Sequence, residues 1–316
     1  MRIVIIGGTG HVGTYLVPRL VLDGHEVISV SRNLGKPYQP HEAWGSVRQV
    51  QIDRTEAERK DDFGVQILAL SPDVVIDMIC FKLESARSLA GALNGKIKHL
   101  LHCGTIWVHG HSSIVPTEET QPRAPFGEYG LQKAAIEKYL LELSRRTEFP
   151  VTILHPGHIA GPGWAPVNPA GNFNLKVFRK LATGQELLLP NFGMETLHHV
   201  HADDVAQAFV CAINNLHDAV GESFHVVSPR AITLRGYAEN MAEYFGQKAK
   251  LKFLPWEEWK DTVGEEDAKA TWDHIAHSPN CSINKARRLL NYKPKYSSLV
   301  AVQEAVEWMK NNDKLS

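Results

Sequence analysis

The chain of 316 residues has no long hydrophobic run, little cysteine and almost no net charge. Its opening apolar segment, "MRIVIIGG", is far too short to span a bilayer, so we expect no membrane anchor. The four cysteines are scattered without a CxxC spacing, which argues against a zinc knuckle or a disulfide framework and indicates reduced thiols in the cytoplasm. A formal net charge of -1 gives no reason to expect nucleic acid or an anionic membrane as a partner.

Short apolar segments alternate with helical patterns over the first half of the chain. Continuous apolar strands separated by helices are typical of a parallel sheet covered on both faces. The sequence therefore predicts an α/β fold, a doubly wound parallel sheet, followed by a less regular C-terminal part rich in loops. The expected strands are "RIVIIG", "EVISVSR", "VRQVQID", "DVVIDMIC", "HLLHC" and "VTILHPG".

The motif "IIGGTGHVGTYL" directly follows the first predicted strand. Gly8, Gly10 and Gly13 satisfy the spacing GxGxxG, and Gly7 with the last two satisfies GxxGxxG. Such glycines make a tight turn into a helix and let the backbone approach a pyrophosphate, which the helix N-terminus stabilises. The motif predicts a dinucleotide-binding Rossmann domain, with cofactor contacts from Gly7, Thr9, Gly10, His11, Val12 and Gly13.

The end of the second predicted strand, "VSRN", indicates which dinucleotide binds. An acidic residue near this position would hydrogen-bond the ribose hydroxyls of NAD, but Ser31, Arg32 and Asn33 stand here instead. Arg32 is placed to meet a 2′-phosphate, and its two neighbours could add hydrogen bonds. We therefore predict NADP as the cofactor, with NAD as the alternative.

The segment "GEYGLQKAAIEK" places Tyr129 and Lys133 four residues apart, on one face of a predicted helix. With the glycine motif and a hydroxyl residue on the strand end between them, this pair resembles the short-chain dehydrogenase/reductase superfamily. The extended type fits best, the family of NAD-dependent epimerases and dehydratases. In "LLHCGTIWVHG", Thr105 matches the catalytic serine or threonine, and His109 replaces the usual tyrosine. "HADDVAQA" and "SINKARRLLNYKP" resemble later family segments, so the resemblance covers nearly the whole chain.

The resemblance implies a set of roles and a division of the chain. Tyr129 would be the acid/base for a substrate carbonyl or hydroxyl, Lys133 would lower its pKa and bind the nicotinamide ribose, and Thr105 would hold the substrate oxygen. Residues 1–156 would form the Rossmann domain, to which 198–227 return, and 157–197 with 228–316 would form a smaller substrate lobe. Further cofactor contacts would come from Asp53, Arg54, Ile79, Lys82, Lys133 and Pro156.

The predicted substrate side departs from that of nucleotide-sugar epimerases. Leu197 and His155 stand where family members have arginines, and His158 replaces an asparagine. A diphosphate needs compensating cations in a partly desolvated pocket. We therefore expect an oxidoreductase or epimerase-like enzyme acting on a small polar, sugar- or polyol-like substrate, with His158 and His199 as pocket residues.

Two other functions stay open. One is a nucleotide-sugar epimerase or dehydratase that holds its diphosphate with histidines and lysines. The other is a non-catalytic dinucleotide-dependent sensor, although the joint presence of Thr105, Tyr129 and Lys133 counts against it. In "HHVH" (His198, His199 and His201), the alternating His199 and His201 point the same way and could chelate a metal. No third ligand stands at a known spacing, so we expect no metal.

The resemblance also implies a homodimer that pairs through the helix of Tyr129. This helix offers more apolar surface than one core-facing stripe needs. The residues concerned are Ala135, Ile136, Tyr139, Leu140 and Leu143.

Overall fold

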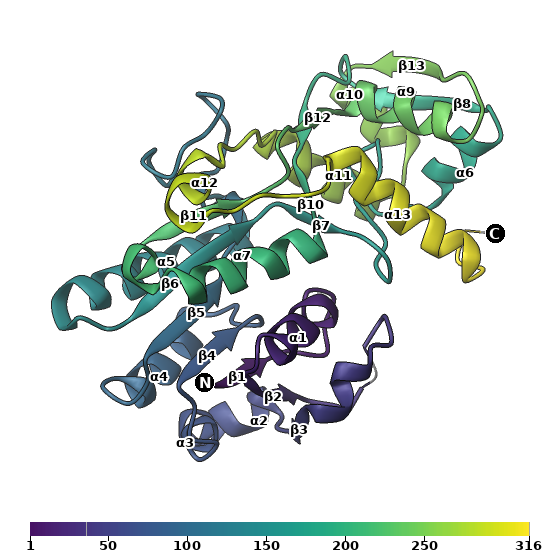
Figure 1. The fold of residues 1–316 in the computed structure, drawn as a ribbon. Coiled ribbons are helices and arrows are strands. Elements are labelled where there is room, and N and C mark those ends of the chain that lie inside the picture. Colours follow the sequence, from purple (N-terminus) through teal and green to yellow (C-terminus); the bar gives the residue numbers. More distant parts are fainter. Residues whose placement is uncertain (36, 316) are drawn as a thin grey trace.

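The computed structural model describes residues 1–35 and 37–315, and it contains a seven-stranded sheet with helices on both faces (Figure 1). The strands are β1 (Arg2–Ile6), β2 (Glu26–Ser31), β3 (Arg48–Gln51), β4 (Val74–Asp77), β5 (His99–Cys103), β6 (Val151–Pro156) and β11 (Ser223–Val226). All of them run parallel, in the order β11-β6-β5-β4-β1-β2-β3. The predicted doubly wound Rossmann fold is thus confirmed.

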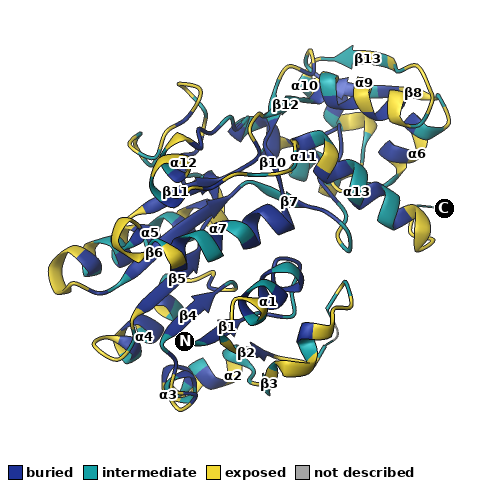
Figure 2. Cartoon of the chain, viewed as in Figure 1, coloured by how far each residue is buried: buried dark blue, intermediate teal, exposed yellow. Residues whose placement is uncertain are grey.

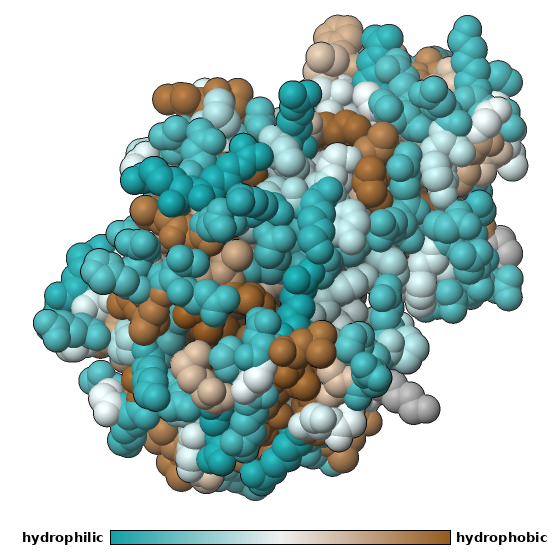
Figure 3. Space-filling model, in the orientation of Figure 1, coloured by the Kyte–Doolittle hydropathy of each residue, from teal (hydrophilic) through white to brown (hydrophobic). Residues whose placement is uncertain are grey.

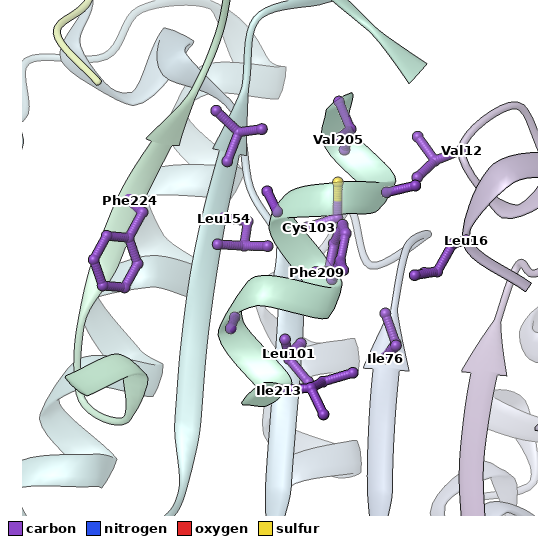
Figure 4. Close-up of a cluster of buried hydrophobic side chains, with 14 of the residues drawn as sticks. Val12, Leu16, Ile76, Leu101, Cys103, Leu154, Val205, Phe209, Ile213 and Phe224 are labelled. Atoms are coloured by element: carbon purple, nitrogen blue, oxygen red, sulfur yellow. The ribbon is translucent and has the colours of Figure 1, made fainter. Parts of the chain in front are cut away.

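Two hydrophobic clusters cover the two faces of this sheet. One face packs against α1 (Gly13–Leu22), α7 (Ala202–Asn214) and α12 (Asn284–Leu290). In Figure 4, side chains of α7 lie over the strands, with Phe209 and Ile213 near Leu101. The other face packs against α3 (Phe63–Leu68), α4 (Leu83–Leu93) and α5 (Gly127–Thr147). The central strands are buried on both sides (Figure 2), which explains their continuous apolar sequences.

The C-terminal lobe has its own hydrophobic cluster, and three small two-stranded sheets lie outside the main sheet. These pair β7 (His158–Ala160) with β10 (His199–His201), β9 (Thr196–Leu197) with β12 (Ile232–Thr233), and β8 (Glu186–Pro190) with β13 (Lys250–Leu254). The lobe's helices are α6 (Lys176–Ala182), α9 (Leu234–Tyr244), α10 (Trp256–Trp259), α11 (Glu265–His277) and α13 (Ser298–Asn311). Short elements complete the chain: α2 (Arg54–Arg59), α8 (Leu216–Ala219), η1 (Glu42–Ser46), η2 (Ile106–His109) and η3 (Lys260–Thr262).

One part of the predicted lobe belongs to the core of the Rossmann half. Helix α12 packs against β11 and α7, and the flanking Cys281 and Tyr292 are buried in the same cluster as the sheet. The remaining domain boundaries stay predictions.

Hydrophilic and hydrophobic residues are both found on the surface of the described part of the chain. Hydrophilic residues cover most of the face in Figure 3, with hydrophobic patches among them. None of the helices in residues 1–35 and 37–315 is both long enough and apolar enough to cross a bilayer. The four cysteines are free, and three of them are buried.

The apolar face of α5 that motivated the dimer is largely used inside one chain. Ile136 and Leu140 are buried in the core, and Tyr139 and Leu143 pack against it. The large apolar side chains that α5 presents to solvent are Leu131, 51% exposed, and Tyr129, 42% exposed. The homodimer stays a prediction.

Candidate active site

A cavity of about 460 Å³ opens at the carboxyl ends of β1, β4, β5 and β6. Ligands of doubly wound folds bind at this edge of the sheet, where the strand order reverses. Many of the predicted site residues meet in its wall. They are Gly7, Gly10, His11, Val12, Gly13, Ile79, Thr105, Tyr129, Lys133, Pro156 and His158.

The glycine loop between β1 and α1 is closely packed against its own backbone. Gly7 has a φ of +88°, in the region that glycine adopts without strain. A Cβ on Gly13 would lie 1.9 Å from the carbonyl oxygen of Gly8. Only glycine at position 13 therefore allows the helix to start this close to the strand, as pyrophosphate binding requires.

We expect Gly13→Ala to destabilise the fold by about 1–3 kcal/mol and to abolish measurable dinucleotide binding, because backbone must move to relieve the overlap. Gly91→Ala in α4 is the matched control. A Cβ there meets nothing within 4 Å, so stability should stay level or rise by up to about 1 kcal/mol. Urea unfolding and cofactor titration measure both effects. Equal behaviour of the two variants would show that the Gly13 contact is unimportant.

Thr105 and Tyr129 lie beside each other in the cavity wall. Thr105 stands two residues after the end of β5 and caps η2, where its Oγ1 accepts a hydrogen bond from the Trp107 amide at 3.3 Å. The Tyr129 residue is 42% exposed, but its hydroxyl end is desolvated beside Thr105. Burial, and to a smaller extent the charge of Cys103, raise the pKa of Tyr129 to about 12, and the hydrogen bond with Thr105 opposes this.

The ammonium of Lys133 is held by the backbone beside the cavity. Its Nζ donates to the carbonyl oxygens of Cys80 (2.8 Å) and Cys103 (2.7 Å) and lies 5.9 Å from the centre of the Tyr129 ring. Without a cofactor, desolvation of the phenol therefore sets the pKa of Tyr129, and the lowering of that pKa by Lys133 stays a prediction for the cofactor-bound enzyme. Burial also lowers the pKa of Lys133 itself.

The predicted adenine-side residues lie outside the cavity wall, near the ends of β2 and β3. Ser31 Oγ donates to the carbonyl oxygen of Asn33 at 2.7 Å, which shapes the turn after β2. Arg32 and Asn33 are exposed, and Arg32 forms no ion pair within the described residues. Thr9, in the glycine loop, also lies outside the cavity wall, and Lys82 is exposed just before α4.

Asp53 and Arg54 mainly hold the fold. Asp53 caps α2, with its Oδ1 accepting the amide of Glu56 at 3.2 Å. The guanidinium of Arg54 is paired with Asp77 at 2.8 Å and with Glu58 at 2.6 Å. The Nη2 of Arg54 is buried without a hydrogen-bond partner, and contact of either residue with a cofactor stays a prediction.

Of the two predicted pocket histidines, only His158 lines the cavity. Both of its ring nitrogens are buried without a hydrogen-bond partner, and burial holds its pKa well below the usual value, so the ring is neutral. His199 is fully buried behind the wall, with its Nε2 bonded to the carbonyl oxygen of Val167 at 3.2 Å, so the prediction that it lines the pocket is wrong.

The other histidines of "HHVH" are likewise engaged in the fold. His198 accepts the Cys281 amide at 3.1 Å, and His201 accepts the Asp203 amide at 3.0 Å. Among the described residues, one buried group of three possible metal ligands lies close together: Asp77, Cys80 and His102. Arg54 already neutralises Asp77 in that group, so it offers no free cation site.

Aromatic residues complete the wall, and sequence analysis missed them. Trp164 stacks on His11 with ring centres 5.3 Å apart, and Phe173 follows in the same loop. His274 of α11 packs against His158 at 4.9 Å. The Pro- and Gly-rich segment after β6 was a signal that could have directed attention to the first two.

The Rossmann fold, the glycine loop and the convergence of Thr105, Tyr129 and Lys133 define a dinucleotide-dependent protein of the short-chain dehydrogenase/reductase type. The family model of the NAD-dependent epimerase/dehydratase family matches residues 3–226. The chain belongs to this family, which confirms the resemblance seen in its sequence.

The relatives that match the chain include a protein named for binding a stem-loop and others named as nucleotide-sugar epimerases. The chain is 26% identical over 303 residues to the chloroplast stem-loop binding protein of 41 kDa b of Arabidopsis thaliana, covering 93% of this chain and 75% of that one. It is 23% identical over 342 residues to a UDP-glucose 4-epimerase of Mycolicibacterium smegmatis, covering 99% and 100%. The crystal structure of a Bacillus cereus UDP-glucuronic acid 4-epimerase with UDP-glucuronic acid and NAD superposes with a TM-score of 0.73 at 16% identity, covering 99% of each chain or more.

Proposed function

We propose that the protein is an NAD(P)-dependent oxidoreductase or epimerase-like enzyme that acts on a hydroxyl or carbonyl of a small, uncharged, sugar- or polyol-like substrate. The observation that carries this proposal is the convergence of Thr105, Tyr129 and Lys133 on one cavity with the glycine loop. A sensor would not need a phenol, a hydroxyl and an ammonium at the cofactor edge.

Tyr129, Thr105 and Lys133 have different roles in the proposed proton transfer. A bound nicotinamide dinucleotide supplies or accepts the hydride. In the reducing direction Tyr129 donates its phenolic proton to the substrate carbonyl oxygen, and Thr105 donates a hydrogen bond to the same oxygen. Lys133, whose ammonium donates to the carbonyls of Cys80 and Cys103, would bind the ribose of the cofactor, and its positive charge would stabilise the phenolate that forms.

The cavity wall favours an uncharged substrate. Lys133 is the only Lys or Arg among the described residues that line it, and this ammonium already donates to two carbonyls. His158 is neutral and offers one unused donor and one unused acceptor between aromatic rings. Such a wall can orient a hydroxyl or carbonyl, whereas a desolvated diphosphate would lack counter-charges.

A nucleotide-sugar epimerase is the second candidate, because a UDP-glucose 4-epimerase matches the chain over its full length. A panel of UDP-sugars in thermal-shift assays, beside turnover of aldoses, polyols and their keto forms with NADPH and NAD, separates the two. Stabilisation by UDP-sugars alone would favour the epimerase. Turnover of small substrates would favour our proposal, and cofactor binding without any turnover would favour a sensor.

Arg32 supports a preference for NADP over NAD. We expect Arg32→Ala to weaken NADPH binding by about 1.5–3 kcal/mol while sparing NADH, because its guanidinium would pair with the 2′-phosphate that NADH lacks. Arg48→Ala is the control, because Arg48 is exposed at the N-terminal end of β3, away from the carboxyl ends of the strands. It should change neither the NADPH nor the NADH affinity. Fluorescence titration of the wild type and both variants measures the six dissociation constants. Wild-type preference for NADH would overturn the assignment.

The homodimer and the cytoplasmic location also remain part of this proposal. Sedimentation at micromolar concentration tests the first.

A further inference from the structure

A buried hydrogen-bonded chain of side chains ends at the backbone of Thr105. His155 on β6 is fully buried, and its Nδ1 lies 3.0 Å from the Thr105 amide nitrogen. Its Nε2 lies 3.0 Å from Glu137 Oε1 on α5. Arg123 holds the same carboxylate with two hydrogen bonds, from Nε at 2.9 Å and from Nη2 at 2.7 Å.

The partners fix the tautomer of His155. A backbone N–H can only donate, so Nδ1 must carry the lone pair and Nε2 the proton, which it donates to Glu137. Burial opposes ionisation of Glu137, but the imidazole and the two hydrogen bonds from Arg123 outweigh it and hold the pKa of the carboxyl well below its usual range. The carboxylate therefore stays an acceptor.

Neighbouring residues make room for this arrangement. A Cβ on Gly104 would lie 2.3 Å from His155 Nδ1, so the ring can reach the Thr105 amide only because residue 104 is glycine. Glu137 stands one turn after Lys133 on the helix that also carries Tyr129. The chain of contacts thus connects the strand end that bears Thr105 to the helix that bears the phenol and the ammonium.

We propose that His155 is a positioning residue: by accepting the Thr105 amide while donating to Glu137, it sets the position of the Thr105 hydroxyl relative to Tyr129. This inference rests on the proposed function of Thr105. Arg123 and Glu137 orient the ring, and none of the three touches the substrate.

Three variants separate the two ring nitrogens. His155→Asn can place an acceptor near the position of Nδ1 but does not reach Glu137. His155→Gln reaches Glu137 but offers no acceptor to Thr105, and His155→Leu does neither. We expect hydrogen exchange of the Thr105 amide to accelerate about tenfold in the Gln and Leu variants and to stay near the wild-type rate in His155→Asn.

Turnover should follow the same order. With a substrate from the panel above, kcat should fall roughly 10- to 100-fold in His155→Gln and His155→Leu, while cofactor affinity and KM change little, because only the placement of Thr105 is lost. His155→Asn should restore most of kcat. Equal losses of kcat in all three variants, or unchanged Thr105 exchange in all three, would overturn the proposal.

The wild-type protein offers a test that needs neither a variant nor a substrate. A long-range nitrogen–proton NMR spectrum shows which ring nitrogen of His155 carries the proton. Protonated Nε2 with bare Nδ1 is the expected result, and protonated Nδ1 overturns the proposal. If the wild-type chain turns over nothing, the proposed function fails, while amide exchange and the NMR spectrum still decide the role of His155.

Discussion

Replacing Tyr129 by phenylalanine is expected to reduce turnover by about 10²- to 10⁴-fold and to leave cofactor affinity nearly unchanged. The phenol is the group that exchanges a proton with the substrate, and its hydroxyl touches Thr105 rather than the glycine loop. Steady-state kinetics and cofactor titration on the same preparations measure both quantities.

A second tyrosine on the same helix serves as the control. Tyr139 lies outside the cavity, with its ring against the guanidinium of Arg87, so Tyr139→Phe should retain wild-type turnover. A Tyr129→Phe enzyme that works at the wild-type rate would mean that another group carries the proton. The helical spacing of Tyr129 and Lys133 would then have no catalytic significance.

Acid should unfold this chain steeply between about pH 6.5 and 4. Burial lowers the pKa of eight histidines to about 4 or below (His11, His99, His109, His198, His199, His201, His274 and His277) and that of three more (His102, His158 and His225) well below 6.5. In this window the unfolded chain binds protons that the folded chain does not. The free energy of unfolding therefore falls as the pH is lowered.

The expected size is large because each such histidine contributes about 1.4 kcal/mol per pH unit. Four of them acting together give about 5.5 kcal/mol per pH unit, a large part of the stability of an ordinary domain. Urea unfolding at a series of pH values measures the slope. His99→Gln, far from the cavity, should reduce it by about 1.4 kcal/mol per pH unit, and the exposed His217→Gln should not. A stability that stays level from pH 7 to pH 5 would contradict this expectation.

The strands most easily predicted were those buried on both faces, because a parallel sheet leaves no polar side to interrupt the pattern. β11 was not predicted, because the buried Ser223 and His225 interrupt its apolar sequence. Their polar atoms are satisfied by partners that lie far away in the chain, such as the carbonyl of Ser282, which bonds His225 Nδ1 at 3.2 Å. Local sequence contains no trace of such partners.

The residues of the candidate site also divide into those that local spacing predicts and those that only the tertiary fold brings together. Tyr129 and Lys133 were found because helical spacing brings them together, and the glycine loop was found because its spacing is local. The stacking of Trp164 on His11 and the contact of His274 with His158 depend on how the lobe folds over the sheet. The direction of the Lys133 side chain depends on two backbone carbonyls. Because every residue has a carbonyl, the sequence does not reveal which ones the ammonium will meet.

The attachment of Lys133 to the loop after β4 and to the end of β5 links the chemistry of the site to the integrity of the sheet. Its buried ammonium donates to the carbonyls of Cys80 and Cys103, which would otherwise lack this donor. Activity and stability are therefore inseparable at this position, and any replacement of Lys133 alters both. An inactive form for trapping bound substrate is better made at Tyr129, where the side chain is partly exposed and only a hydroxyl has to be removed.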